Sequence, residues 1–283
     1  MKKLILILLC ISFGHIYSKE IKVYNANEFV EAIESNVTLL IMDSIIISDL
    51  DKDKSGSNFR VQLAHDGPEL VITKVKNLNI IGSTEYPTDI VTDPRYGWVI
   101  QFENCSNILI DNINAGHTDP GYCTGGVFSF MDCQNITIDN SIIFGSGTVG
   151  ISATNVKNLN CNNSLIWGCT YNILELSNSM YVKFNNCEFS DNRGFNMFHI
   201  ISSIKVEFNN CIIKNNVATY KCDGGSWFGQ LSIFDVKSSV SIVLKSCVIE
   251  NNITCHFSKN KSDLTLNNII FKNNNFIKGT YKN

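Results

Sequence analysis

The stretch Asn135-Ile136-Thr137-Ile138-Asp139-Asn140-Ser141-Ile142-Ile143-Phe144-Gly145 recurs along the chain in altered forms. Its relatives begin at Asn77, Asn107, Asn158, Tyr181, Lys205, Ser241 and Asp263. Aligning each copy on its sixth residue gives the anchors Gly82, Asn112, Asn140, Asn163, Asn186, Asn210, Ser246 and Asn268. Subtracting these positions gives intervals between 22 and 36 residues, with 23 or 24 in the middle of the chain. A period in this range predicts a solenoid in which each repeat forms one coil.

Apolar residues keep a constant distance from each anchor. The positions four and two residues before the anchor are apolar in every copy, and polar or small residues are common between them. This alternation is typical of a strand with one buried face. Further apolar rows stand twelve and ten residues before the anchor, and another stands three residues after it. Each coil should therefore contain two strands and a third short one, pairing in parallel with those of its neighbours.

The anchor row itself is mostly Asn. Asparagine tolerates turn conformations, and its amide group can both donate and accept hydrogen bonds. Stacked copies can therefore bond to one another and to the backbone of the turn. We expect an architectural asparagine ladder here rather than a functional row.

The first 18 residues resemble a secretory signal peptide. Met1-Lys2-Lys3 precedes an apolar run from Leu4 to Phe13, which is too short to span a bilayer, and cleavage after Ser18 is expected. No later segment is apolar enough to cross a membrane, so the mature chain should be secreted, periplasmic or held at the cell surface.

Residues 19–69 are predicted to form an N-terminal cap and first strand, before β-helix repeats over residues 70–283. The pattern from Asn25 to Ile33 favours a short amphipathic helix with Asn25 or Asn27 as its cap, and Val37 to Ile47 is a strand-forming run. A solenoid must cover its open end, which such a helix can do.

Charge and cysteine content narrow the function. The net charge of −3 and the pI near 6.0 give no reason to expect nucleic-acid binding, and the Lys and Arg residues do not cluster into a basic stripe. Ten of the 11 cysteines follow the signal peptide. Five of them keep a fixed position in the repeat, which predicts buried core thiols: Cys105, Cys133, Cys187, Cys211 and Cys247. Cys123 and Cys222 lie in predicted loops about four coils apart, which is too far for a disulfide unless both loops lean inward.

The repeat resembles the single-stranded right-handed parallel β-helix of the pectin-lyase-like superfamily, an all-β fold with three-strand coils, an Asn ladder and an N-terminal capping helix. Residues 115–127 and 145–150 also resemble uncharacterised exported bacterial β-helix proteins. The likeness implies the fold but no single activity, because this fold hosts lyases, hydrolases, epimerases and adhesins. The family's Asp-Asp, Gly-His-Gly and Arg-Ile-Lys motifs are absent, and Arg193 is the only arginine among the regular coils. No motif specifies a metal or a cofactor.

A candidate site comes from the row eleven residues before the anchor, which lies between two inward rows and should face outward. This row reads Val71, Gln101, Ser129, Ser152, Glu175, His199, Asp235 and Phe257. Glu175, His199 and Asp235 would lie on successive strands about 4.8 Å apart. We assign them as candidate catalytic residues, because flanking carboxylates would raise the pKa of the imidazole and support acid–base chemistry or a metal site. A surface ion pair without function is the open alternative.

Two long loops, residues 116–126 and 219–230, should form the walls of a groove over this row. The candidate substrate-binding residues are Ser129 and Ser152 on its floor, His117, Asp119, Tyr122 and Trp227 in the loops, and Arg193. Loops on a rigid scaffold often carry function, although solenoids also tolerate insertions. His117 could equally stabilise its turn.

The sequence is consistent with two functions. One is an exported protein that recognises carbohydrate, such as a polysaccharide, with lyase, hydrolase or epimerase activity as a possible extension. The other is a non-enzymatic surface, structural or adhesin-like protein whose polar outer rows keep it soluble.

Overall fold

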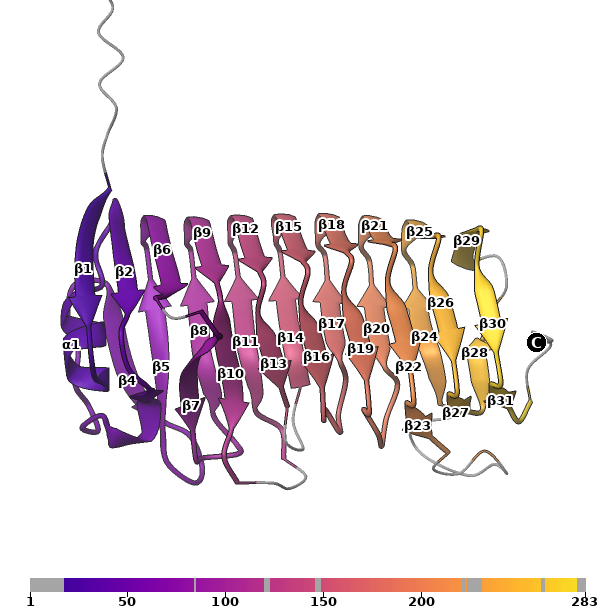
Figure 1. Ribbon diagram of the computed structural model, residues 1–283, viewed down its shortest axis with the longest axis horizontal. Coiled ribbons are helices and arrows are strands. Elements are labelled where there is room, and N and C mark those ends of the chain that lie inside the picture. Colours follow the sequence, from indigo (N-terminus) through magenta and orange to yellow (C-terminus); the bar gives the residue numbers. More distant parts are fainter. Residues whose placement is uncertain are drawn as a thin grey trace, which may run out of the picture.

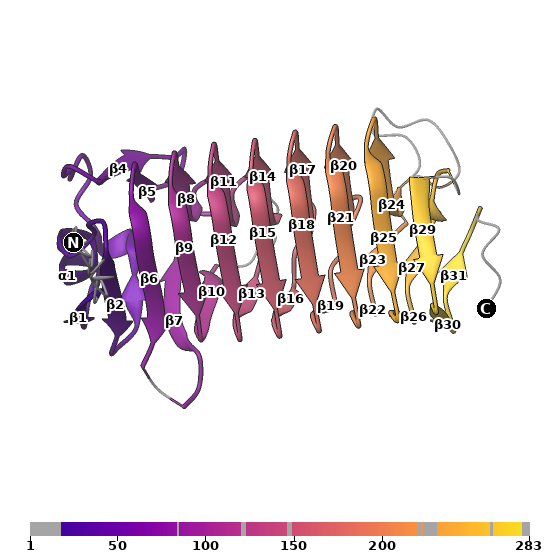
Figure 2. The ribbon, with the colours of Figure 1, turned by 90° about the horizontal axis from the view of Figure 1, so that it is seen from above.

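The computed structural model describes residues 18–83, 85–119, 123–145, 149–219, 222, 231–260 and 263–278. These residues form a parallel β-helix whose coils stack along one axis, from α1 at one end to β31 at the other (Figure 1). The same rod is seen from above in Figure 2. The predicted all-β parallel β-helix is confirmed. The predicted signal peptide lies outside the described residues except for Ser18.

Three long sheets form the faces of the rod. Sheet A has the order β1 (Lys19–Val23), β2 (Val37–Ile41), β6 (Lys76–Gly82), β9 (Ser106–Asp111), β12 (Gln134–Asp139), β15 (Lys157–Asn162), β18 (Met180–Asn185), β21 (Ile204–Asn209), β25 (Val240–Lys245) and β29 (Leu264–Asn267). Sheet B has the order β3 (Ile45–Ile46), β7 (Thr88–Thr92), β10 (Ile113–His117), β13 (Ile142–Phe144), β16 (Leu165–Trp167), β19 (Glu188–Ser190), β22 (Ile212–Lys214), β26 (Val248–Glu250) and β30 (Ile270–Lys272).

Sheet C carries the candidate site. Its order is β28 (His256–Ser258), β24 (Ser232–Lys237), β20 (Phe198–Ile201), β17 (Leu174–Ser177), β14 (Val149–Thr154), β11 (Gly126–Met131), β8 (Trp98–Glu103), β5 (Pro68–Thr73) and β4 (Phe59–Leu63). A short sheet D joins β23 (Val217–Ala218), β27 (Ile253–Thr254) and β31 (Asn275–Phe276). Among the described strands every pair is parallel except β4 with β5, at the N-terminal edge of sheet C.

The N-terminal end is covered by the predicted helix. Helix α1 spans Ala26–Glu31, and the side chain of Asn25 accepts a hydrogen bond from the Glu28 backbone N–H at 3.0 Å. Glu28 in turn accepts one from the Tyr24 backbone N–H at 2.9 Å. This reciprocal arrangement is a capping interaction, and it directs the buried Phe29 and Val30 onto the first coil. A 3₁₀ turn, η1 (Ile47–Asp49), directly follows β3. No helix among the described residues could span a membrane.

The core consists of the predicted apolar rows stacked coil upon coil. Phenylalanines stack face to face across neighbouring coils, with ring centroids 5.0 Å apart for Phe184 and Phe208 and 4.7 Å apart for Phe198 and Phe234. The five predicted core cysteines are all buried free thiols, as expected. Each coil thus covers the apolar face of the next, and burial of roughly 25 cal/mol per Å² of apolar surface drives the stacking.

The turns explain the abundance of asparagine. From Asn112 to Asn268 every anchor residue has a positive φ, between 46° and 57°. Most residues with side chains avoid this left-handed region, and Asn enters it more readily. The amide of Asn186 donates to Asn163 Oδ1 at 3.1 Å, so the exposed anchor row does form the predicted ladder.

A second, buried ladder six residues after the anchors was not predicted. It contains Asn192, Asn216, Asn252 and Asn274. The Asn216 Oδ1 accepts from both the backbone and the side-chain amide of Asn192, at 3.1 and 2.9 Å, and the Asn216 amide donates to Asn252 Oδ1 at 2.9 Å. Buried polar groups satisfied in this way hold neighbouring coils at one register.

Replacing Asn216 by Ala should therefore destabilise the protein by about 2–4 kcal/mol, because the amide of Asn192 and the backbone N–H beside it lose their acceptor inside the core. The measurement is the free energy of unfolding in urea. The matched control is Asn210→Gly in the exposed row, where glycine keeps the left-handed turn and the change should stay below about 1 kcal/mol. Equal losses in the two variants would contradict the assignment of coil register to the buried ladder.

Candidate functional site

Glu175, His199 and Asp235 occupy one row on β17, β20 and β24, as predicted. The sheet pairs Ser152 with Glu175, Glu175 with His199, and His199 with Asp235. The row does not continue to Phe257. Since β24 pairs Phe234 with Ser258, the residue that follows Asp235 is Lys259, and Phe257 is fully buried. Val71, at the other end of the predicted row, is also fully buried.

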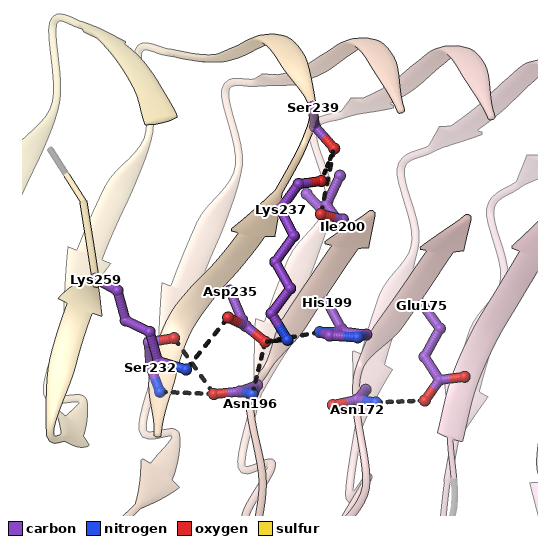
Figure 3. Close-up of polar contacts among 10 residues, drawn as sticks. All are labelled: Asn172, Glu175, Asn196, His199, Ile200, Ser232, Asp235, Lys237, Ser239 and Lys259. Carbon is purple, nitrogen blue, oxygen red and sulfur yellow. Dashed lines mark hydrogen bonds and ion pairs between the residues drawn. The ribbon is translucent and has the colours of Figure 1, made fainter. Parts of the chain in front are cut away.

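His199 and Asp235 form a hydrogen-bonded dyad (Figure 3). Their Nδ1 and Oδ2 atoms lie 2.8 Å apart. Asp235 Oδ2 also accepts from the Asn196 amide at 3.1 Å and lies 3.5 Å from Lys237 Nζ. Asp235 Oδ1 lies 3.2 Å from Lys259 Nζ. One carboxylate is thus surrounded by donors, and it is only 2% exposed.

This environment keeps Asp235 ionised. Burial alone would raise the pKa of its carboxyl group, but the hydrogen bond with His199 and the charges of Lys259 and Lys237 together hold the pKa well below its usual range. A permanently ionised carboxylate at Nδ1 favours the imidazole form that carries its proton there. The other ring nitrogen, Nε2, is then available to a ligand.

Glu175 does not complete a symmetric triad. Its Oε1 accepts a hydrogen bond from the amide of Asn172, three residues earlier, and no hydrogen bond joins it to His199. In Figure 3 its carboxylate lies on the side of His199 opposite Asp235. The two carboxylates lie on the strands on either side of His199, as expected, but their contacts differ: Asp235 binds the ring, whereas Glu175 is a half-buried neighbour.

A hollow of about 380 Å³ opens over this row. It is lined by Tyr171, Asn172, Glu175, Phe195, Asn196, His199, Leu231, Asp235 and Lys237. The rings of Tyr171 and Phe195 stack with centroids 4.8 Å apart and an interplanar angle of 12°. Both aromatic residues are half-buried, so they present an apolar surface beside the polar groups of the row.

Tyr171 and Phe195 were missed by the sequence reasoning, although a signal was present. Tyr171-Asn172 and Phe195-Asn196 each precede a member of the row by the same number of residues, and the corresponding pair before Asp235 is Leu231-Ser232. The second residue of each pair supports the row. Asn172 donates to Glu175, Asn196 donates to Asp235, and the Ser232 backbone N–H donates to Asn196 Oδ1 at 2.9 Å.

The serines predicted for the floor lie outside the hollow. Ser129 and Ser152 continue the row toward the N-terminal end, and Ser129 is buried. The hollow is thus displaced toward Asp235, because the Tyr171–Phe195 stack stands beside Glu175 and His199. Arg193 is exposed and does not line the hollow; its backbone N–H donates to the Cys169 carbonyl at 2.8 Å.

His117 lies in a different environment from the one predicted. Strand β10 extends to His117, which pairs with Thr92 of β7, so this part of the predicted loop is a strand. The ring is fully buried, its Nε2 lies 3.0 Å from the Gly97 carbonyl oxygen, and burial lowers its pKa. Asp119 is exposed beyond the end of β10. Tyr122 and Trp227, together with most of the second predicted wall, lie outside the described residues.

Cys222 is not bonded to Cys123, as predicted, but it does form a disulfide with another cysteine. Cys222 forms a disulfide with Cys255, and Cys123 is a buried free thiol. Sequence spacing did not identify Cys255, because the insertion before β24 hides which residues of the two coils lie side by side. Among the described residues no group of three or more His, Cys, Asp or Glu side chains is arranged to hold a metal ion.

Solved structures with the same fold include proteins of different activities. The Streptococcus pneumoniae surface protein and adhesin PfbA is 13% identical, with a TM-score of 0.50 over 93% of this chain and 88% of its own. A pectate lyase variant from Xanthomonas campestris is 11% identical, with a TM-score of 0.52 over 94% and 83%. A glycoside hydrolase is 10% identical, with a TM-score of 0.54 over 86% of this chain and 48% of its own, so the chain spans about half its length.

At these identities the structural likeness concerns the fold alone. No curated protein matches the sequence. The family model described as a right-handed β-helix region matches residues 69–230, which is more than half of the 283-residue chain. This match agrees with the resemblance to the pectin-lyase-like superfamily and with the three parallel sheets, and the chain belongs to the right-handed β-helix family.

Proposed function

We propose that this chain is an exported β-helix protein that binds a carbohydrate chain in the hollow over Glu175 and His199. The observation that carries this proposal is the Tyr171–Phe195 stack, a half-buried aromatic surface beside convergent amide, carboxylate and imidazole groups. Sugars have apolar C–H faces and hydroxyl rims, so an aromatic surface beside polar groups is complementary to them. The volume of the hollow falls in the range of small-molecule sites.

Each part of the hollow has a proposed role in binding. The aromatic pair packs against one face of a sugar ring, while Glu175 accepts hydrogen bonds from hydroxyl groups. His199 contributes Nε2, because Nδ1 is engaged by Asp235. Asn172 and Asn196 mainly hold the side chains of the row in place through the hydrogen bonds described above. Glu175, His199 and Asp235 sit on strands of a rigid solenoid, which favours a preformed site.

Chemistry at this site would rest on the dyad. Asp235 orients His199 through Nδ1, so that His199 could take up and return a proton at Nε2. Glu175, on the adjacent strand about 4.8 Å away, would act on the substrate from the other side. This arrangement suits a lyase, hydrolase or epimerase. Asp235 is a positioning residue in this scheme, because both of its oxygens are already bonded.

The alternative is a non-enzymatic, adhesin-like protein that uses the same hollow for binding without turnover. One observation favours it: of the two carboxylates at the site, only Glu175 is accessible enough to meet a substrate, since Asp235 is buried. Incubation with a panel of polyuronates and neutral glycans, with and without calcium, separates the two. Product formation that is lost in His199→Ala supports the enzyme, and binding without product supports the alternative.

Export is part of the proposal. The disulfide between Cys222 and Cys255 is of a kind that persists in oxidising compartments, and the resemblance of residues 1–18 to a signal peptide agrees with it. Surface or secreted β-helix proteins such as the PfbA adhesin have the same fold.

Replacing Tyr171 or Phe195 by Ala should weaken glycan binding by roughly fivefold or more, because each loses an aromatic contact of the size that commonly contributes about 1 kcal/mol or more. Glu175→Ala and His199→Ala should lower affinity at the same site. Binding is first located on a glycan array and then measured by calorimetry. The control is Tyr181→Asn, which removes an exposed ring on sheet A and keeps a residue suited to positive φ. Retained binding in all four site variants would reject this hollow.

The dyad also predicts the acid stability of the protein. Because the folded-state pKa of Asp235 is depressed, its stabilising contribution is complete above the unfolded pKa of about 4 and is lost as pH falls below that value toward the folded pKa. We expect the melting temperature of the wild type to fall more steeply between about pH 5 and pH 2 than that of Asp235→Asn, which should already be destabilised at pH 7. Parallel curves would show that Asp235 is not ionised and paired as described.

A further inference from the structure

Two aromatic residues lie next to each other on the outer face of sheet B, a different face of the rod from the hollow on sheet C. Phe144 ends β13 and Trp167 ends β16, and the sheet pairs the two residues directly (Figure 1). Trp167 is 42% exposed, and Phe144 is half-buried. Among the described strands of sheet B from β7 to β30, no other outward position carries Phe, Tyr or Trp. The pair is therefore a local feature and not a property of the repeat.

The two rings lie along the sheet and do not cover each other. A Cβ added to Gly116, on the preceding strand, would overlap the Phe144 ring, so this ring fills the space where a side chain would otherwise stand. The centroids of the Phe144 and Trp167 rings are 6.2 Å apart, and their planes are inclined by 31°. The face-to-face pair of Tyr171 and Phe195 is closer and more nearly parallel, at 4.8 Å and 12°. We call the open surface of Phe144 and Trp167 the aromatic platform.

The platform belongs to a small apolar patch with polar borders. Ile142 and Leu165, two residues earlier on the same strands, are half-buried and extend the patch along the sheet. On the N-terminal side the neighbour of Ile142 is Asn114. On the C-terminal side the neighbour of Leu165 is Glu188, which forms an ion pair with Lys214 at 2.9 Å. Apolar patches that are bordered by polar groups commonly mark interaction sites.

The size and chemistry of the patch favour a sugar over a protein partner. The patch is two strands wide, with strands about 4.8 Å apart, whereas a stable protein interface takes about 800 Å² from each partner. An open aromatic face suits the C–H face of a sugar ring. The amide, carboxylate and ammonium groups at the borders of the patch suit its hydroxyl groups.

The platform also lies on the same coil as the hollow. Trp167 ends β16, and Tyr171 follows it by four residues, in the turn that leads to β17. Strands β16 and β17 are consecutive, so the two surfaces occupy the same level of the rod on adjoining faces. A long chain molecule bound at one surface would therefore lie near the other.

We propose that the aromatic platform is a second carbohydrate-binding surface, which holds a polysaccharide by stacking sugar rings on Trp167 and Phe144. This surface is separate from the hollow, so binding at the platform does not depend on the function proposed above. A polysaccharide that reaches both surfaces would be held more tightly through the increase in effective concentration.

The test measures retardation of the full chain during electrophoresis in gels that contain polygalacturonate, xylan or a mixed-linkage β-glucan. The wild type should be retarded by at least one polymer. Trp167→Ala and Trp167→Leu should each raise the dissociation constant for that polymer by roughly fivefold or more, because the stacking surface is lost. Trp167→Phe keeps a ring and should retain most of the affinity.

The Leu and Phe variants separate ring stacking from general apolar contact. Full binding by Trp167→Leu, or equal binding by the wild type and Trp167→Ala, would overturn the proposal, as would a wild type that no polymer retards. Tyr181→Asn on sheet A is the control and should bind as the wild type does. Melting temperatures of the Trp167 variants should stay within about 3 °C of the wild type, because the side chain is on the surface.

Two further measurements distinguish the platform from its alternatives. In sedimentation, a wild type that dimerises and a monomeric Trp167→Ala would show that the patch joins two copies of the chain, and the proposal would fail. The Tyr171→Ala/Phe195→Ala variant removes the hollow and should still be retarded through the platform. If this variant binds as the wild type does while Trp167→Ala does not, the hollow fails and the platform stands. If only the hollow variant loses binding, the platform fails and the proposed function stands.

Discussion

Coil-to-coil register is the constraint on which this molecule depends. Short parallel strands cannot bury their apolar faces alone, so each coil must meet its neighbours with every row aligned. The buried amides of Asn192, Asn216 and Asn252 enforce that alignment, because each Oδ1 accepts from the preceding coil and a slip would leave buried donors without acceptors. Stacked phenylalanines fill the space that this register leaves. The asparagines of the turns serve a different purpose, since they allow the chain to change direction with positive φ.

The same register assembles the candidate site. Residues 36 positions apart in sequence, His199 and Asp235, meet at hydrogen-bond distance because they hold the same position on neighbouring strands. The pairs Tyr171-Asn172 and Phe195-Asn196 also meet because of this register: two neighbouring coils each contribute an aromatic ring and an amide just before their strand of sheet C. A solenoid can build a site of this kind by changing a few outward residues without altering the core.

The C-terminal side of the site is built differently. The coil that carries Asp235 contains an insertion, and the strand beyond it has only three residues. The neighbour of Asp235 in the row is Lys259, and a disulfide joins this coil to the preceding one. The buried Phe257 of β28 packs on Phe234, which continues the core to this end of the rod. The cations of Lys237 and Lys259 stabilise the charge of a carboxylate that burial would otherwise neutralise.

The sequence by itself determined the architecture: the recurrence around Asn135 predicts the coils, the alternation predicts which residues are buried, and Asn25 predicts the cap of α1. It also placed Glu175, His199 and Asp235 on one row, because the row follows from counting. Only the tertiary structure decided which groups make contact. In the folded chain Asp235 contacts His199, Glu175 contacts Asn172, and the buried His117 contacts the Gly97 carbonyl oxygen. Two further features depend on the insertion before β24. One is the Cys222–Cys255 bond, and the other is that Lys259, and not the predicted Phe257, is the neighbour of Asp235 in the row. Counting from a repeat fails there, since pairing across an insertion is set by packing in three dimensions.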